Sequence, residues 1–319
     1  MSVEGSVNMT SEKAGESFYS DEHVRRLEAQ GFSSVEIKVE REYTDFQGNV
    51  HHRDYLAWFE RGREHVIFIN KLTELYEEFG QSFVVTASEQ VFHSAAKYGD
   101  IIEVRTIPLL DGLYRIGFDQ SIWRSNTNEL LVSGFVEMVV VNSEFKPVQL
   151  PPLFKNTLSL FEKFKKNCSY IQPKRLPKIP LRKTKGGERS PVASFEMVYH
   201  QAGSDFTGVT FHPNYYCWFA RARVDFFGLD FLKTLEHTHG ILPTTQSAKL
   251  KYKNSTRPYE KLLIETFRCP EQSTQYVLAL DQVLYRDPGK VECVIASFEV
   301  AFTCIKTGAL VPVPKDISM

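Results

Sequence analysis

Two carboxylates occur in the chain at the same spacing from a glycine, a histidine and a tyrosine. The two sets are Asp45, Gly48, His52 and Tyr55, and Asp205, Gly208, His212 and Tyr215. Around them, residues 45–63 reappear as residues 205–223 with nine identical positions among nineteen. Unrelated sequence would give roughly one such identity, so the chain is read as two copies of one unit.

Each set lies where a polar turn leads into a helix. Pro213, directly after His212, suits the first turn of a helix. A carboxylate therefore stands at a helix N-terminus, where the helix dipole and main-chain N–H groups favour chemistry on a carbonyl. The N–H donors expected there belong to Asn49, Val50 and His51 in the first copy and to Val209, Thr210 and Phe211 in the second.

Aromatic residues at helical spacing follow each motif. Tyr55, Trp58, Phe59, Gly62 and Val66 fall on one face, and the second copy repeats this register. The pattern predicts a long helix with an apolar face toward a sheet, and the small Gly62 favours a close approach between helix and sheet.

Strand-like runs flank the helix in both copies. Residues 35–43 alternate between apolar and charged side chains, which is the period of a half-buried strand. Four further runs, expected to form a meander, follow the helix at 83–93, 100–109, 114–124 and 129–142, and at 242–253, 261–268, 276–285 and 291–306. Five strands bury one helix only if the sheet curls around it.

The predicted fold class is α+β, with two such units in tandem. The long edges of each sheet favour pairing between the units, which would form an intramolecular pseudo-dimer. The expected boundaries are a flexible leader with a short helix at 1–31, units at 32–152 and 192–319, and a linker at 153–191.

The linker region carries eleven basic residues against two acidic ones. A solvated linker is the simpler interpretation of this composition. The alternative is a docking surface for an acidic carrier protein or for the phosphates of coenzyme A.

The bulk composition narrows the class of protein. A net charge of -1 over 319 residues gives no electrostatic argument for binding nucleic acid. Five cysteines without a CxxC pair indicate reduced thiols and a cytoplasmic location. The sequence shows no signal peptide and no apolar run long enough to span a membrane, and it leaves a higher homo-oligomer open.

The Asp-x-x-Gly-x-x-x-His-x-x-Tyr spacing resembles that of hotdog-fold thioesterases of the 4-hydroxybenzoyl-CoA thioesterase and YbgC-like type. Phe211 to Tyr215 make the second copy the more similar one. The resemblance implies a helix wrapped by a sheet, paired units whose sheets join back to back, and active sites between the units. It implies Asp45 and Asp205 as catalytic carboxylates, with His52, His212, Tyr55 and Tyr215 lining the same motif.

The residue chemistry agrees with hydrolysis of an acyl-CoA or acyl-carrier-protein thioester. A thiolate leaves easily because thiols ionise near pKa 8.5, so the reaction needs mainly a nucleophile and a site for the oxyanion. Either aspartate can activate water or attack the carbonyl directly, and the sequence leaves both routes open. We expect no metal and no cofactor.

Other interpretations remain for the same residues. The aspartates also suit turns or helix caps, and the histidines suit a role in orienting the turn. A hotdog acyl-CoA hydratase or dehydratase and a non-catalytic acyl-binding or regulatory module are the alternative functions. Because Arg53 and Asp54 replace Pro213 and Asn214, we expect two unequal sites, with the second the more active.

Overall fold

The structure is a computed structural model that describes residues 30–45, 47–67, 69–111, 113–151, 154, 190–205 and 207–318. Most of the predicted leader and nearly all of the basic linker lie outside these residues. The boundaries predicted for those two segments therefore stay predictions.

The first unit contains five strands and two main helices. Its elements are β1 (Ser33–Lys38), the 3-10 helix η2 (Arg41–Tyr43), α2 (His52–Ile67), α3 (Ile69–Phe79), β2 (Ser82–Phe92), β3 (Ile101–Asp111), β4 (Arg115–Arg124) and β5 (Glu129–Val141). Nearly all the strands predicted from hydrophobic patterning lie within two residues of these bounds. The exception is the first, because residues 41–43 turn into η2.

The second unit repeats this order. Its elements are β6 (Ala193–Val198), η4 (Gln201–Gly203), α5 (Asn214–Phe227), α6 (Leu229–His237), β7 (Ile241–Tyr252), β8 (Lys261–Arg268), η5 (Pro270–Gln272), β9 (Val277–Asp287), β10 (Val291–Cys304), β11 (Leu310–Val311) and α7 (Lys315–Ser318). The same patterning thus produces the same chain path twice.

The single long helix predicted for the second unit is in fact two helices. In the second unit α5 ends at Gly228, whose φ of 84° is a left-handed conformation that stops a helix, and α6 starts at once. In the first unit the bounds are His52–Ile67 for α2 and Ile69–Phe79 for α3, and residue 68 lies outside the described residues. The aromatic stripe itself is core as predicted, since Trp58 and Phe59 are almost fully buried.

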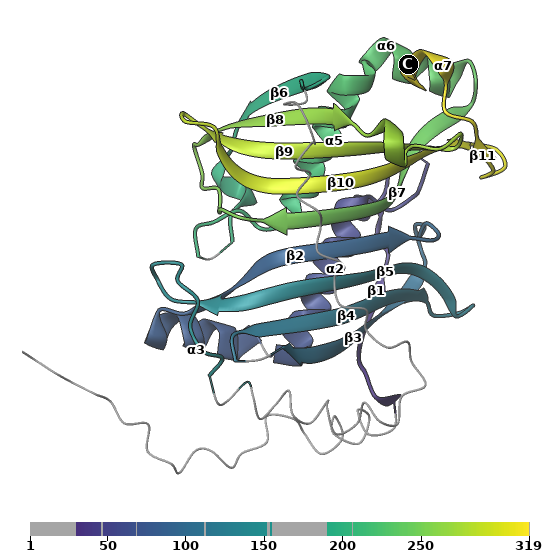
Figure 1. Ribbon diagram of the computed structural model, residues 1–319. Helices are drawn as coiled ribbons and strands as arrows, with labels where there is room; N and C mark the ends of the chain where they lie inside the picture. Colours follow the sequence, from purple (N-terminus) through teal and green to yellow (C-terminus); the bar gives the residue numbers. More distant parts are fainter. Residues whose placement is uncertain are drawn as a thin grey trace, which may run out of the picture.

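All described strands belong to one antiparallel sheet. Its order is β1-β3-β4-β5-β2-β7-β10-β9-β8-β6, with β11 on β10. The expected meander is correct only for the last three long strands of each unit, because β2 lies beyond β5 and β7 beyond β10. Figure 1 shows β2 and β7 side by side in the middle of the sheet.

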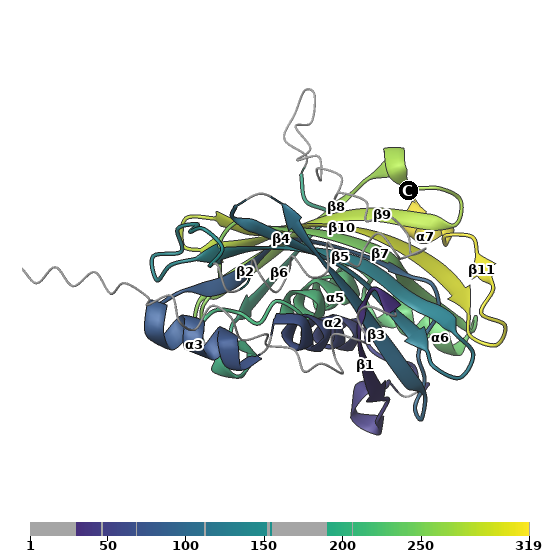
Figure 2. The same ribbon diagram turned by 90° about the horizontal axis from the view of Figure 1, so that it is seen from below.

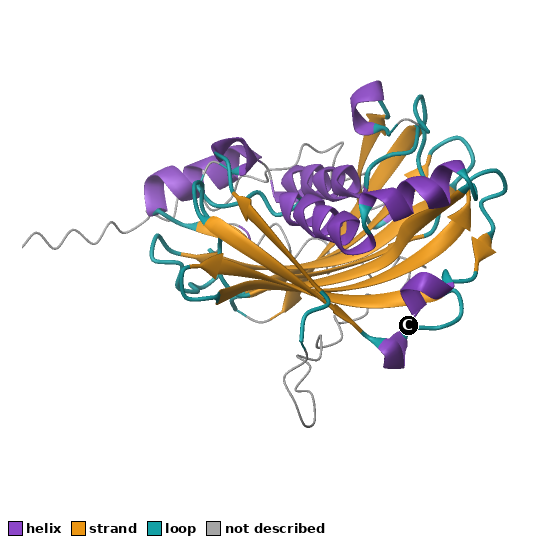
Figure 3. Ribbon diagram, turned by 90° about the horizontal axis from the view of Figure 1, so that it is seen from above, coloured by secondary structure: helices purple, strands orange, loops and turns teal. Residues whose placement is uncertain are grey.

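The two sheets join edge to edge, which corrects the back-to-back arrangement expected from the resemblance. Residues Ala87 to Val91 of β2 pair with Lys251 to Ser247 of β7. The joined sheet curves over α2 and α5, which lie next to each other on its concave face (Figures 2 and 3). Leu56 of α2 packs into the same buried cluster as Tyr216 and Phe219 of α5, so part of the contact between units is apolar.

No described helix combines the length and hydropathy needed to cross a membrane.

Gly62 marks the closest approach of α2 to the sheet. A Cβ placed on it would lie 2.6 Å from Thr106 Oγ1 and 3.0 Å from Val104 Cγ1. We predict that Gly62→Ala lowers the free energy of unfolding by about 1–3 kcal/mol, because the helix must move away from the sheet. Urea denaturation measures the change. Ala222 lies at the same place in α5 and already carries a Cβ, so Ala222→Gly serves as the matched control. An unchanged urea midpoint for Gly62→Ala would contradict the close approach.

Candidate functional site

Both aspartates close the turn in front of their helix. Asp45 Oδ1 accepts main-chain N–H groups of Gln47 at 2.8 Å and Asn49 at 3.0 Å. Asp205 Oδ1 accepts the N–H and the hydroxyl of Thr207 at 2.8 and 2.6 Å. The turn interpretation is therefore correct for one oxygen of each carboxylate, while Oδ2 of Asp205 receives neither bond from Thr207.

A glycine in the left-handed conformation completes each turn. Gly48 has φ 77° and Gly208 φ 79°, and each donates its N–H to the carbonyl of the preceding aspartate. Any other residue would be strained at this φ. The glycines thus hold the two aspartates in equivalent positions.

Most main-chain N–H groups expected to polarise a carbonyl are already bonded within the protein. Thr210 donates to Thr256 O and Phe211 to Gly203 O, and in the first copy Val50 and His51 donate to Ala96 and Tyr43. The prediction of free donors is wrong at these positions, because the incoming loop is itself held by those bonds. In the second copy the N–H of His212 has no hydrogen-bond partner among the described residues.

The two tyrosines hold a second loop against each motif. Tyr55 accepts the N–H of Ala96 at 2.7 Å, and the Tyr215 hydroxyl lies 3.1 Å from Thr256 Oγ1. Burial raises the pKa of Tyr215 to about 12. Both hydroxyls therefore stay neutral and position the loop.

The histidines have different partners. His52 Nε2 lies 3.3 Å from Thr245 O on β7, and burial, with Arg223 nearby, lowers its pKa to about 4.

His212 lies between two side chains of α2 in the other unit. Its Nδ1 is 3.4 Å from Glu60 Oε2, and its Nε2 is 3.3 Å from Arg63 Nη2.

This geometry fixes the state of the His212 ring. A neutral ring accepts the Arg63 N–H at Nε2, while its Nδ1 lies near the Glu60 carboxylate. Burial lowers the pKa of His212 to about 3, with Glu60 acting in the opposite sense. His212 is therefore neutral at ordinary pH.

Glu60 and Arg63 form a partly buried ion pair that reaches His212 from the first unit. Arg63 also donates to Gln120 Oε1 at 2.6 Å, and Gln120 donates to Phe59 O and Thr106 Oγ1. Burial would raise the pKa of Glu60, but Arg63 and His212 outweigh it and hold that pKa below its ordinary value. Glu60 is thus an ionised carboxylate that orients its neighbours.

A cavity of about 740 Å³ opens between the two units at this point. Its wall in the second unit includes Asp205, Val209, Thr210, Phe211, His212 and Tyr215, which are the predicted site residues of the second copy except Gly208. Its wall in the first unit contains Glu60, Arg63 and Glu64, followed by Ile67, Leu72, Leu75, Phe83, Val85 and Met138. The cavity lies where residues 82–86 and 252–255 extend beyond the β2–β7 pairing.

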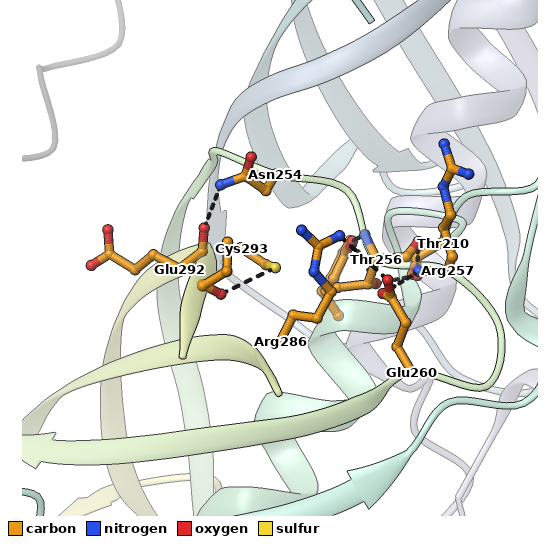
Figure 4. Close-up of polar contacts among 10 residues, drawn as sticks. Thr210, Asn254, Thr256, Arg257, Glu260, Arg286, Glu292 and Cys293 are labelled. Atoms are coloured by element: carbon orange, nitrogen blue, oxygen red, sulfur yellow. Dashed lines mark hydrogen bonds and ion pairs between the residues drawn. The ribbon is translucent and has the colours of Figure 1, made fainter. Parts of the chain in front are cut away.

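Cations and their partners form part of the cavity wall in the second unit. Figure 4 shows Arg257, Glu260 and Arg286 together. Arg286 pairs with Glu260 at 3.3 Å, the Arg257 N–H donates to the same carboxylate, and the Arg257 guanidinium lies 5.7 Å from the Phe145 ring of the first unit. This side of the cavity is charged, whereas the opposite wall is largely apolar.

The first copy of the motif does not reach this cavity. Asp45, Gly48, Asn49, Val50, His51, His52 and Tyr55 are absent from its lining. The position of α5 that corresponds to Glu60 is Ala220. His52 therefore faces a main-chain carbonyl and Arg223, with no carboxylate equivalent to Glu60.

Sequence reasoning missed Glu60 and Arg63 as site residues. Both lie in the repeated stretch, but their side chains complete the motif of the other unit. A comparison of the two copies could have drawn attention to Glu60, because the corresponding residue of the second copy is Ala220.

No group of three or more histidine, cysteine or acidic side chains in the described part of the chain is placed to hold a metal ion.

Comparisons with known proteins agree with the geometry. Residues 201–319 match the model of the thioesterase-like superfamily. The acyl-CoA thioesterase YbgC of Helicobacter pylori is 29% identical over 133 residues, which are 39% of this chain and 98% of that protein. The predicted resemblance to hotdog thioesterases is confirmed.

Solved structures share the fold over most of the chain. The 12:0-ACP thioesterase from Umbellularia californica matches with a TM-score of 0.67 and 13% identity, covering 90% of this chain and 99% of that one. A putative oleoyl thioesterase from Lactobacillus plantarum matches with a TM-score of 0.65 and 12% identity, over 85% and 96% of the two chains. At these identities the likeness concerns the hotdog fold alone.

The lowered pKa of His52 has a consequence for stability. The unfolded chain binds a proton near pH 6.5 and the folded chain only near pH 4, so the folded state loses stability as pH falls below 6.5. At pH 5 the loss from this residue is about 2 kcal/mol. We predict that His52→Gln reduces the difference in unfolding free energy between pH 7.5 and pH 5 by about that amount.

Urea titrations at the two pH values test this prediction. His51→Gln, at the exposed neighbouring position, is the matched control. An equal pH dependence in wild type and His52→Gln would show that His52 is not buried in its neutral form.

Proposed function

We propose that this chain hydrolyses thioesters between an acyl group and coenzyme A or an acyl carrier protein. The observation that carries the proposal is a turn-anchored carboxylate, Asp205, in a cavity whose opposite wall is largely apolar. The names of the relatives and of the structural neighbours support the same reaction class. The chain is thus an enzyme that releases a free acid and a thiol.

Asp205 acts as the base or as the nucleophile. Its Oδ1 is fixed by Thr207, which leaves Oδ2 for water or for the carbonyl carbon. Burial raises its pKa, with the bonds from Thr207 and Val209 acting in the opposite sense, so its carboxylate is more basic than an exposed one. Glu60 is a weaker base, because Arg63 and His212 stabilise its charge.

The thioester oxygen needs a donor as the carbon becomes tetrahedral. The main-chain N–H of His212 has no partner among the described residues and stands just before α5, where the helix dipole favours negative charge. The His212 ring, held by Glu60 and Arg63, fixes this residue in place. We infer that His212 contributes its N–H to the oxyanion and its side chain to positioning.

The apolar wall suits the acyl chain. Ile67, Leu72, Leu75 and Phe83 lie on it, and burial of apolar surface supplies affinity at about 25 cal/mol per Å². The thiolate leaves without acid assistance, because thiols ionise near pKa 8.5. The two units would act as an intramolecular pseudo-dimer, with boundaries at 32–152 and 192–319 and one complete site between them.

The two alternative functions predict different results in an assay of thiol release. A hydratase or dehydratase would change the absorbance of an enoyl-CoA without releasing thiol. An acyl-binding module would bind acyl-CoA and release none. Thiol release from acyl-CoA and acyl-carrier substrates separates all three functions.

We predict that the two aspartates contribute unequally. Asp205→Asn should lower kcat at least a hundredfold, because the amide can neither take a proton from water nor attack. Asp45→Asn is the matched control, and it should retain most activity because Asp45 lies outside the cavity. Thiol release by the two purified variants measures both effects, and similar losses in the two would refute the single-site assignment.

We predict an acid limb in the pH profile of kcat/KM that lies above the ordinary aspartate pKa of 3.8, because the base is active only when ionised and burial raises its pKa. No second inflection is expected near pH 6.5, since His212 is neutral down to about pH 3. Stopped-time assays between pH 4 and 9 give the profile. A limb near pH 6.5 that disappears in His212→Gln would instead make the histidine the titrating base.

A further inference from the structure

We propose that Glu64 makes the enzyme select acyl groups that carry a hydrogen-bond donor close to the thioester, such as 3-hydroxyacyl groups. The inference rests on the proposed thioesterase function and names the substrate class of the same cavity.

Glu64 lies between the reactive end of the cavity and its apolar wall. Glu60, Arg63, Glu64 and Ile67 occupy one face of α2 and all line the cavity. One helical turn, about 6 Å, separates Glu60 from Glu64. An acyl chain that runs from Asp205 and Glu60 toward Ile67 therefore passes Glu64 within its first few carbons.

The carboxylate of Glu64 has no hydrogen-bond or ion-pair partner among the described residues. Of the neighbouring Arg63 guanidinium, Nη1 donates to Gln120 and Nη2 pairs with Glu60. Burial and then the charge of Glu60 raise the pKa of Glu64, while Arg63 and Arg61 act in the opposite sense. A partly desolvated carboxylate without a donor is unfavourable, and a ligand hydroxyl would supply the missing bond.

The repeat provides an internal comparison. In α5 the positions of Glu60 and Glu64 hold Ala220 and Val224, whereas Arg63 keeps its counterpart Arg223. The helical scaffold and its buried arginine thus require no carboxylate at position 64. Glu60 and Glu64 both lie on the face of α2 that lines the cavity, which indicates that they contact the ligand.

The chemistry of a carboxylate sets the class of substituent. It accepts a bond from a hydroxyl, but it repels a keto oxygen, which has only lone pairs to offer. A hydroxyl-to-carboxylate bond in a partly buried site contributes enough for about a tenfold preference. An unsubstituted chain leaves the carboxylate without a donor and gains no such preference.

The test compares 3-hydroxydecanoyl-CoA, decanoyl-CoA and 3-oxodecanoyl-CoA as substrates of the full chain at pH 8, with thiol release as the readout. The wild type should show a kcat/KM about tenfold higher for the hydroxy substrate than for the other two. In Glu64→Leu this ratio should fall to about one. Glu77→Leu, which removes an exposed carboxylate of α3, is the matched control and should keep the ratio.

The outcomes separate this inference from the proposed function. Hydrolysis of all three substrates at equal kcat/KM by the wild type, or an unchanged ratio in Glu64→Leu, overturns the role of Glu64 and leaves thioester hydrolysis intact. If the wild type hydrolyses none of them, the proposed function fails for acyl-CoA substrates, and calorimetric binding of the same three compounds decides the inference. A tenfold tighter Kd for the hydroxy compound would support it, and equal Kd values would overturn it.

Discussion

The buried guanidinium of Arg63 is the group on which the arrangement of the site depends. A charge removed from water needs hydrogen-bond acceptors or an opposite charge, and Gln120 and Glu60 provide both from the same unit. Truncating Glu60 would leave that charge uncompensated, at a cost of about 3–5 kcal/mol. Because Arg63 also bonds to the His212 ring, the core of the first unit directly contacts the residue that precedes α5 in the second.

Arg223, the counterpart of Arg63 in the second unit, shows that a buried arginine at this position has a structural role in the fold. It donates to Gln282 at 2.9 Å, lies 4.0 Å from the Phe298 ring and has no carboxylate at the place of Glu60. Burial lowers its pKa to about 10. A glutamine amide therefore accepts a hydrogen bond from the buried arginine in either unit, and an aromatic face is added in the second. In the first unit the carboxylate of Glu60 is added instead, beside the other unit's histidine.

Local patterns in the sequence predicted the strands, the aromatic helix face, the close approach at Gly62 and the two aspartate turns, because each depends on neighbouring residues. The strand order could not be read in this way. In the sheet, β2 lies next to β5 instead of next to β3, and its other neighbour is β7 of the second unit. The completion of the Asp205 site by Glu60 was hidden for the same reason, since 145 positions separate two side chains that only the edge-to-edge sheet brings together.

The duplicated motif therefore specifies a turn, and the opposite helix decides whether that turn lies in a site. Asp45 and Asp205 are held by equivalent bonds beside glycines of nearly the same φ. The two copies differ in the surface of the other unit that faces the histidine. His212 meets an ion pair and a cavity beside the Tyr252 ring, whereas His52 bonds to a main-chain carbonyl and packs at 4.5 Å against Phe92, the counterpart of Tyr252. In the proposed reaction the first turn therefore contributes stability, while the second carries the chemistry.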